Sequence, residues 1–366
     1  MRAKITHHPA ICHSFPWYDI MSRKKTRRQL CLFALFLAFV STESTCDEAT
    51  TQTYQGAFSF VFENDLFSGN DNNYTNGLSF NVTSAAVDTL GRKNFFVKTA
   101  KVFSFLPTVL DDRYQNFVGY RLTQEIYTPP DLSLPAPQPG EQPYAGVLLA
   151  DVSLYSKARR SQHTYIFAVG VVGPASGARE TQELIHWWTE SPEPKGWDTQ
   201  LSNELLLNVG YLYDYRLFRR VKHGVNGFDI STGVGAGLGN YITNAQGSAI
   251  IRFGRDIPDT YNGFNIRTGS NTNVTLAPPP KKYRIYGSLG ITIVAVAHFL
   301  PTDGNTFTDS YSGERDDFYA STAAGIVFAY QKFSLVFNYN RNFGATQRPG
   351  TTEKDYNSLS MIWFFE

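Results

Sequence analysis

Charged residues are scarce in this sequence of 366 residues. Lysine, arginine, aspartate and glutamate together make up 18% of the chain, whereas roughly 25% is typical of globular proteins. The formal net charge is only +1, so the composition shows no basic excess of the kind that binds nucleic acid. We therefore expect no nucleic-acid partner.

Cysteine is nearly absent. The three cysteines, Cys12, Cys31 and Cys46, all lie close to the N-terminus. If this region is removed on export, the mature chain has no disulfide and no cysteine-based metal site.

The sequence also lacks an apolar run long enough to cross a membrane as a helix, which needs roughly 20 residues. The uninterrupted apolar stretch from Leu30 to Val40 follows a basic segment that begins after Met21, and small and polar residues come next. This order is that of a secretory signal peptide. An uncleaved N-terminal anchor is the alternative, but the stretch is short for that role.

These features divide the chain into three parts. We interpret residues 1–20 as an upstream extension, with Met21 as the true start. Residues 21–46 are the predicted signal peptide, cleaved between about Thr42 and Cys46. Residues 47–366 are the predicted exported domain.

Aromatic residues and glycine are abundant, with 28 Phe, 21 Tyr and 29 Gly. Apolar residues alternate with polar or small ones over 78–83, 203–217, 228–239 and 333–340. Such alternation, with apolar side chains facing lipid, is typical of transmembrane β-strands. A soluble β-sandwich is the alternative, but its strands average about five or six residues, far fewer than the pattern over 203–217.

An exported chain without a membrane helix can span a bilayer as a closed barrel, because closure satisfies every backbone polar group. We count about twelve strand candidates, from 55–63 to 356–365. The predicted fold is therefore all-β, a transmembrane antiparallel β-barrel of about twelve strands over residues 47–366. An even number of strands puts both ends on the periplasmic side.

Strand parity then sorts the connections between the two barrel ends. The odd-numbered connections 64–76, 129–143 and 174–202 should share the outer rim, and Gln331-Lys332 should be a tight periplasmic turn. The even-numbered connection 85–113 is long, and we expect it to contain an interfacial helix on the periplasmic side.

Connection 64–76 is rich in oxygen donors. It contains Asn64, Asp65 and Thr75 among further Asp, Asn and backbone oxygens, which are the ligands that Ca²⁺ prefers. It is not an EF-hand loop, because position six counted from Asp71 is Asn76 and no Glu closes it. The alternative is turn chemistry without a metal, since Asn, Asp and Gly dominate turns.

Connection 174–202 carries the candidate general base. Residues from Ala178 to Thr189 lack Gly and Pro and predict a short helix that contains His186. A histidine titrates near neutral pH and is suited to activating water. Trp187, Trp188 and Trp197 suit a membrane interface. No Gly-x-Ser-x-Gly motif is present, so a serine nucleophile has no support.

Several motifs together resemble one enzyme family, the calcium-dependent lipid A 3′-O-deacylases of the outer membrane. They occur in the family order and are Glu63-Asn-Asp-Leu-Phe, Tyr74-Thr-Asn-Gly77, Gln124-x-x-Tyr-Thr-Pro129, Pro143-Tyr-Ala-Gly146, Val171-Val-Gly-Pro174, Gln182-x-x-x-His186 and Gly196-Trp-Asp-x-Gln200. The resemblance covers essentially the whole mature chain. It implies a twelve-stranded barrel that hydrolyses the 3′-linked acyloxyacyl ester of lipid A with Ca²⁺ as cofactor and a histidine base.

The resemblance also implies roles for single residues. His186 corresponds to the catalytic histidine, Thr75 to the site threonine, and Asn64 and Asp65 to the polar pair at the calcium site. The family glutamate falls on Pro192 by strict spacing, so Glu193 or Glu190 would replace it. We therefore expect His186, Thr75 and Asn64 as catalytic residues and Asp65, Asn64 and Glu193 as metal ligands.

Headgroup contacts should differ from those of the family, because Asp131–Gln142 contains no lysine or arginine for the lipid A phosphates. The expected partners are lipid A or lipopolysaccharide as substrate and outer-membrane lipids, with no obligate protein partner. The expected location is the bacterial outer membrane, with the active loops facing the cell exterior. An outer-membrane phospholipase and a catalytically silent pore or structural barrel are the rival interpretations.

Overall fold

The structure, a computed structural model, describes residues 54–64, 73–222, 225–261, 276–280, 282–344 and 354–366. The predicted extension 1–20, the signal peptide 21–46 and the candidate ligand Asp65 lie outside the described residues. The barrel and most of its connections form one compact unit, Gln52–Ile185 with Pro192–Glu366. The segment His186–Ser191 falls in a second unit and is described by itself below.

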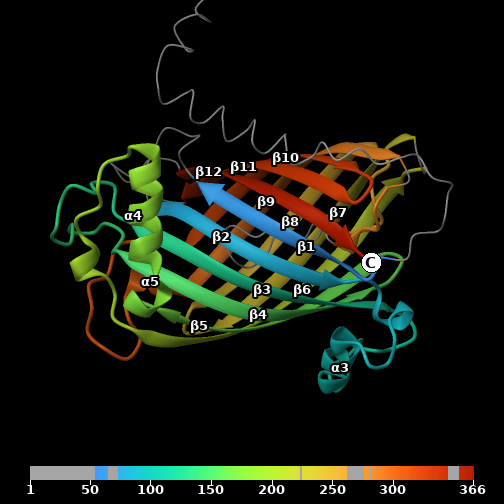
Figure 1. Ribbon diagram of the computed structural model, residues 1–366, viewed down its shortest axis with the longest axis horizontal. Coiled ribbons are helices and arrows are strands. Elements are labelled where there is room, and N and C mark those ends of the chain that lie inside the picture. The colour runs from blue at the N-terminus through green and yellow to red at the C-terminus, as the bar shows by residue number, and fades with distance from the viewer. Residues whose placement is uncertain (1–53, 65–72, 223–224, 262–275, 281, 345–353) are drawn as a thin grey trace, which may run out of the picture. The chain divides into compact units, whose positions relative to one another are not determined.

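The main unit is a closed antiparallel barrel in which each strand pairs with its neighbours in sequence and β1 pairs with β12. The predicted twelve-stranded barrel is confirmed (Figure 1). The strands are β1 Gly56–Asn64, β2 Asn73–Ser84, β3 Gln115–Thr128, β4 Ala145–Lys157, β5 Ser161–Val172, β6 Glu204–Arg220, β7 Asn226–Gly239, β8 Ile242–Arg255, β9 Tyr283–Phe299, β10 Phe318–Tyr330, β11 Phe333–Gly344 and β12 Lys354–Phe365.

Short helices occupy the connections. They are α3 Phe95–Val102, α4 Ala178–Thr189 and α5 Leu300–Asp303, with the 3-10 turns η1 Val87–Thr89, η2 Pro174–Ser176 and η3 Trp197–Thr199. The helix predicted over Ala178 to Thr189 is confirmed as α4. None of the helices in the described residues is long and apolar enough to cross a membrane.

The two faces of the wall follow the alternation in the sequence. Along β6, Leu205, Leu207 and Val209 are 61%, 56% and 47% exposed, whereas Leu206 and Asn208 between them are 0% and 9% exposed. The outward side chains are thus apolar and the lumen is filled by the inward ones, as a lipid-facing barrel requires.

Strand direction separates the connections into two rims, as predicted. Among the described residues of the barrel unit, the loop rim carries 129–144, 173–185, 192–203, 240–241 and 300–317, and the terminus rim carries 85–114, 158–160, 221–222, 256–261, 276–280 and 331–332. The tight turn at Gln331-Lys332 and a helix within 85–113 are both confirmed. In Figure 1, α3 and the C-terminus lie at one end of the barrel and α5 lies at the other.

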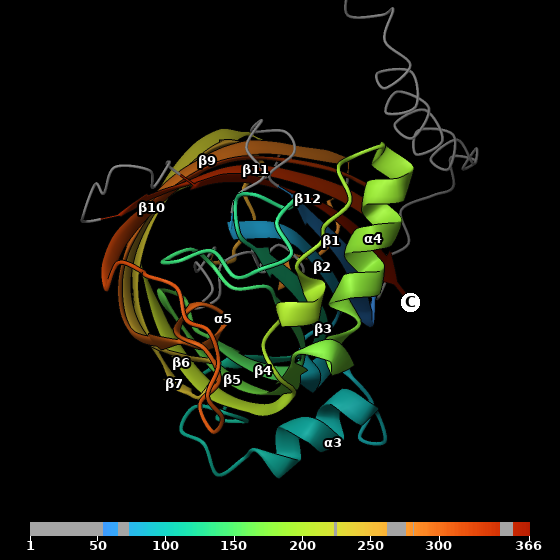
Figure 2. The same cartoon turned by 90° about the vertical axis from the view of Figure 1, so that its left-hand side faces the viewer.

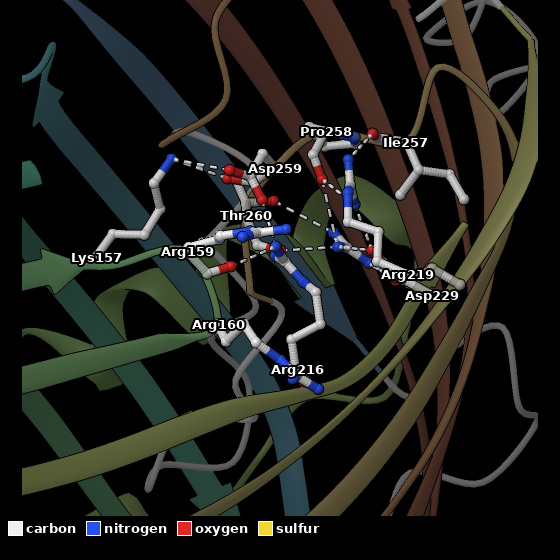
Figure 3. Close-up of polar contacts among 11 residues, drawn as sticks. Lys157, Arg159, Arg160, Arg216, Arg219, Asp229, Ile257, Pro258, Asp259 and Thr260 are labelled. Atoms are coloured by element: carbon white, nitrogen blue, oxygen red, sulfur yellow. Dashed lines mark hydrogen bonds and ion pairs between the residues drawn. The ribbon is translucent and has the colours of Figure 1, made fainter. Parts of the chain in front are cut away.

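The connection between β8 and β9 enters the lumen at the terminus rim, which the alternation pattern does not predict. Ile257 packs among inward side chains such as Tyr286 and Val336. Arginines on the inner wall donate to its backbone: Arg216 to Thr260 O at 3.0 Å and Arg219 to Ile257 O at 2.8 Å (Figure 3).

Buried ion pairs hold these arginines. Asp229, which is fully buried, accepts from Arg252 Nε at 2.8 Å and from Arg219 Nη1 at 2.5 Å. Arg252 also donates to Thr260 O at 2.7 Å, and Arg284 donates to Asp256 O at 2.8 Å. The guanidinium groups thus join the inner wall to the connection and fill this end of the barrel.

Candidate functional site

A row of polar residues interrupts the apolar outward face at the loop rim. Asn64 of β1 pairs with Asn76 of β2 on one side and with Asn357 of β12 on the other. Glu63 and Gly77 come directly before Asn64 and directly after Asn76 and lie on the inward face. Because strand side chains alternate and the three asparagines are paired across the strands, all three lie on the outward face. They are only 2%, 2% and 7% exposed. Buried amides on a lipid-facing wall need polar partners, which marks this position as a candidate site.

Thr75 lies at an irregularity of the wall beside this row. The pairing of β2 with β3 shifts register between Tyr74 and Asn76, so Thr75 is the extra residue of a bulge. Tyr74 points inward, where its hydroxyl donates to Glu63 Oε2 at 2.6 Å. Asn76 alternates regularly with Leu78 and Phe80 and shares their outward face. Without the bulge, Tyr74 would share that face too, so the bulge turns Tyr74 inward towards Glu63.

Behind the row, the inner face of the wall is acidic and buried. Glu63 and Glu125 flank Gly77 on neighbouring strands and are 3% and 1% exposed. Tyrosine hydroxyls hold both carboxylates: Tyr74 donates to Glu63, and Tyr127 donates to Glu125 Oε2 at 2.8 Å. The bond from Tyr74 to Glu63 joins β2 to β1, the two strands that present Asn76 and Asn64.

The start of α4 rests against the same outward face. A Cβ on Gly146 of β4 would lie 2.2 Å from the Cβ of Ala178 and 2.3 Å from Ser176 Oγ. Gly146 is therefore needed for this close approach. Gln124 on β3 donates from Nε2 to Ser176 O at 2.7 Å. These contacts position the first turn of α4 beside the ends of β3 and β4.

Trp197 anchors the next turn of α4. The indole is 1% exposed, and its Nε1–H donates to Oε1 of Gln182 at 2.7 Å. The ring also meets Tyr144 edge-on at 5.1 Å. Gln182 is 1% exposed, and its Nε2 has no hydrogen-bond partner in the described chain. His186 follows Gln182 by four residues, which is one turn further along the helix.

The segment His186–Ser191 contains the last turn of α4. Ser191 N–H donates to His186 O at 3.0 Å, and Glu190 has a φ of 57°. A left-handed residue at this position is a usual way to end a helix. The indoles of Trp187 and Trp188 are exposed.

Three connections of the loop rim are hydrogen bonded to one another. Lys195 N–H donates to Leu132 O at 2.9 Å, and Thr302 Oγ1 donates to Gln142 Oε1 at 2.7 Å. Burial raises the pKa of Asp303 in α5, but bonds from His298 and Arg315 outweigh this and bring that pKa to about 2. The base of α4 thus belongs to a connected layer of loops.

The predicted carboxylate ligands do not form a buried cluster in the described residues. Asp65 lies outside the described residues, and Glu193 and Glu190 are both exposed. Within the residues that the structure describes, no three His, Cys, Asp or Glu side chains gather as a metal site.

Comparison with known proteins decides the family. The model of the outer membrane protein LpxR family matches residues 30–365. The chain belongs to the LpxR family. This confirms the resemblance inferred from the motifs and agrees with an outer-membrane location. No curated protein sequence matches the chain.

A solved structure shares the barrel fold of this LpxR-family chain. LpxR from Salmonella typhimurium is 15% identical with a TM-score of 0.68, over 84% of this chain and 100% of that one. At this identity the likeness concerns the fold. The β-domain of the Bordetella autotransporter BrkA is 9% identical with a TM-score of 0.41, over 86% of this chain and 99% of that one.

Sequence reasoning missed several residues of the candidate site. The sequence analysis assigned no role to Gln182 or Asn357. It placed Trp197 at a membrane interface, whereas the indole of Trp197 is buried, with 1% exposed. The spacing of Gln182 and His186 was a usable signal, since residues four apart share one helix face. Asn357 could have been found as a polar residue at an outward position of the last strand.

Proposed function

We propose that this chain is an outer-membrane hydrolase that removes the 3′-linked acyloxyacyl group from lipid A. The observation that carries the proposal is the row of buried asparagines on the outward wall at the loop rim. A polar site on the outside of a barrel, at its rim, lies where a lipid headgroup meets its acyl chains. Membership of the LpxR family supports the same activity.

The residues around the row fit a calcium ion. Asn76 Oδ1 is buried and has no hydrogen-bond partner in the described chain, directly across from Asn64. A free carbonyl oxygen is a suitable ligand for this hard cation. We propose Asp65, Asn64 and Glu193 as further ligands. Calcium, when bound, supplies positive charge that stabilises the oxyanion of the ester.

The chain's own groups would carry the remaining steps. His186 takes a proton from the attacking water, as a general base. Thr75, at the bulge, orients water or substrate. The interlocked loops around the first turns of α4 keep the histidine helix in position. With the loop rim facing the cell exterior, the site meets the outer leaflet.

The test is mass spectrometry of lipid A from Gram-negative cells that express the chain. Wild-type protein should yield lipid A lighter by one acyloxyacyl group. His186→Asn should leave lipid A unmodified. The control His163→Asn changes a histidine on the outward face of β5, near the terminus rim, and should behave like wild type. Unmodified lipid A with a correctly folded wild-type barrel would contradict the proposal.

A phospholipase is the second candidate. The observation in its favour is that Asp131–Gln142 has no basic residue for the phosphates of lipid A. The same cells would then accumulate lysophospholipids while lipid A stays intact. Absence of both products from a folded barrel would favour a silent pore or structural protein.

A further inference from the structure

The connection between β2 and β3 carries a helix on the lipid-facing side of the wall. α3 packs Val97 and Ala100 against Val118 of β3 and Leu154 of β4. Leu122, on the same face of β3 as Val118, is 47% exposed, so this face is the outward one. Figure 2, which looks along the barrel, shows α3 outside the ring of strands.

The segment that follows α3 is fixed to the same face. Phe103 stacks on Phe167 of β5 with ring centroids 4.9 Å apart. The hydroxyl of Tyr165, also on β5, donates to Pro107 O at 2.6 Å. The helix and its continuation therefore have a defined position on the wall at the terminus rim.

The other side of this segment exposes large apolar side chains. Phe95, Val102 and Phe105 are 66%, 69% and 74% exposed. Phe95 and Val102 are seven residues apart and lie on one side of the helix. A cluster of this kind is unfavourable in water and marks a surface that another medium or molecule covers.

Basic side chains accompany the apolar ones, and acidic side chains are missing. Residues 89–110 contain Arg92, Lys93, Lys98 and Lys101 and no Asp or Glu. All four basic residues are exposed. The structure gives no ion pair for any of them within the described chain, whereas nearby Arg113 pairs with Asp111 at 2.7 Å.

We propose that Phe95–Phe105 is an interfacial docking surface for anionic phospholipids of the leaflet at the terminus rim. Phe95, Val102 and Phe105 enter the boundary between headgroups and acyl chains, while Lys98 and Lys101 reach lipid phosphates. Charge complementarity and continuity with the lipid-facing wall favour lipid over a protein partner. This inference rests on the proposed function in one respect only, namely that the leaflet at the terminus rim is the periplasmic one.

The experiment uses the whole chain in nanodiscs. Cys12, Cys31 and Cys46 are replaced by serine, and Phe105→Cys carries an environment-sensitive fluorophore. The discs contain zwitterionic phospholipid with or without anionic phosphatidylglycerol, and either lipid can carry brominated acyl chains. The dye should emit as in an apolar medium, and brominated phosphatidylglycerol should quench it at a lower mole fraction than brominated phosphatidylcholine.

Charge reversal tests the role of the lysines. Each lysine at an anionic surface contributes roughly a fivefold preference for anionic lipid. Lys98→Glu with Lys101→Glu removes both charges and adds repulsion, so the preference should fall by at least about 25-fold. Lys98→Arg with Lys101→Arg should keep the preference. Lys222→Glu, an exposed charge change at the same rim away from α3, should keep it too.

Three outcomes would overturn the proposal. Emission typical of water in every nanodisc would mean that this surface does not meet the bilayer. A shielded dye that brominated lipid does not quench would mean that protein covers the surface. Equal quenching by both lipids, unchanged on charge reversal, would mean that the lysines select no headgroup. None of these readouts needs ester hydrolysis, so a failure of the proposed function would leave them unaffected.

Discussion

The replacement Trp197→Phe tests whether α4 is held by a single buried hydrogen bond. Phenylalanine keeps an aromatic ring against Tyr144 but removes the indole N–H that donates to Gln182 Oε1 at 2.7 Å. Gln182 is 1% exposed, so its oxygen would lose its donor inside the protein. Leaving a buried acceptor unpaired costs about 1–3 kcal/mol.

That cost should appear as local opening of α4, because the barrel wall does not use this bond. If the free energy of opening of α4 falls by about 1–3 kcal/mol, the open state should be roughly 5- to 150-fold more populated. Hydrogen exchange of the amides of Thr181–Ile185, followed by mass spectrometry, measures it directly when exchange occurs through local opening. Deacylation should fall as well if His186 depends on this helix.

The matched control is Trp363→Phe. Trp363 lies on the outward face of β12 and is 55% exposed, so its replacement should leave exchange in α4 unchanged. Exchange in the Trp197→Phe protein equal to that of wild type would refute the view that Trp197 anchors α4. Faster exchange throughout the barrel would instead show that the loss is global.

Four further predictions concern the site and the barrel. His186→Asn should lower deacylation by roughly 10²–10⁴-fold with normal heat-modifiable migration; near-wild-type rates would rule out the base. Chelation should abolish hydrolysis, Ca²⁺ should restore it and Mg²⁺ should restore little, with Asp65→Ala imitating chelation; full activity in excess chelator would exclude the metal. Asp229→Ala leaves the buried Arg252 without its carboxylate and should lower unfolding stability by about 3–5 kcal/mol; a smaller effect in denaturant titrations would mean that solvent reaches this end of the lumen. The pKa of Asp303 is about 2 in the folded chain and about 3.9 in the unfolded chain. The ionised Asp303 therefore stabilises the fold above pH 4, and this contribution to the free energy of unfolding is lost as the pH falls towards 2. Asp303→Asn should flatten the pH dependence of the free energy of unfolding in that range.

The wall of the barrel could be predicted because its chemistry is periodic. Lipid outside and a packed lumen inside force every second residue of β6 and β7 to be apolar, and this pattern is visible without coordinates. The helix Ala178–Thr189 could be predicted for a similar local reason, since it lacks Gly and Pro.

The filling of the lumen could not be predicted from this periodicity. Alternation shows that Arg216 and Arg252 face inward, but it does not show what they bind. Arg219 faces inward only because the pairing of β6 with β7 shifts register between Arg216 and Phe218. Their partners include backbone oxygens of Ile257 and Thr260, which have no signature in the sequence. Long-range pairing of this kind is fixed by three-dimensional packing alone.

The candidate site was partly predictable. Connection parity put residues 64–76 and 174–202 on one rim, and the structure confirms this for their described residues, Asn64 and Asn73 in the first connection and 174–185 with 192–202 in the second. The outward direction of Asn76 follows from its alternation with Leu78 and Phe80, but the inward direction of Tyr74 was not predictable, because it depends on a single extra residue, Thr75, in the pairing of β2 with β3. A one-residue bulge reverses the face of all that follows it.

The outward position of the asparagine row has a consequence for how a substrate would arrive. Asn64, Asn76 and Asn357 lie on the outside of the wall, so a membrane lipid could reach them by lateral diffusion in its own leaflet. Neither extraction into water nor passage through the ion-paired lumen would be needed. The relevant substrate concentration is then the number of molecules per unit area of membrane. Diluting the substrate in the bilayer with inert lipid should slow the reaction even when its bulk concentration stays constant.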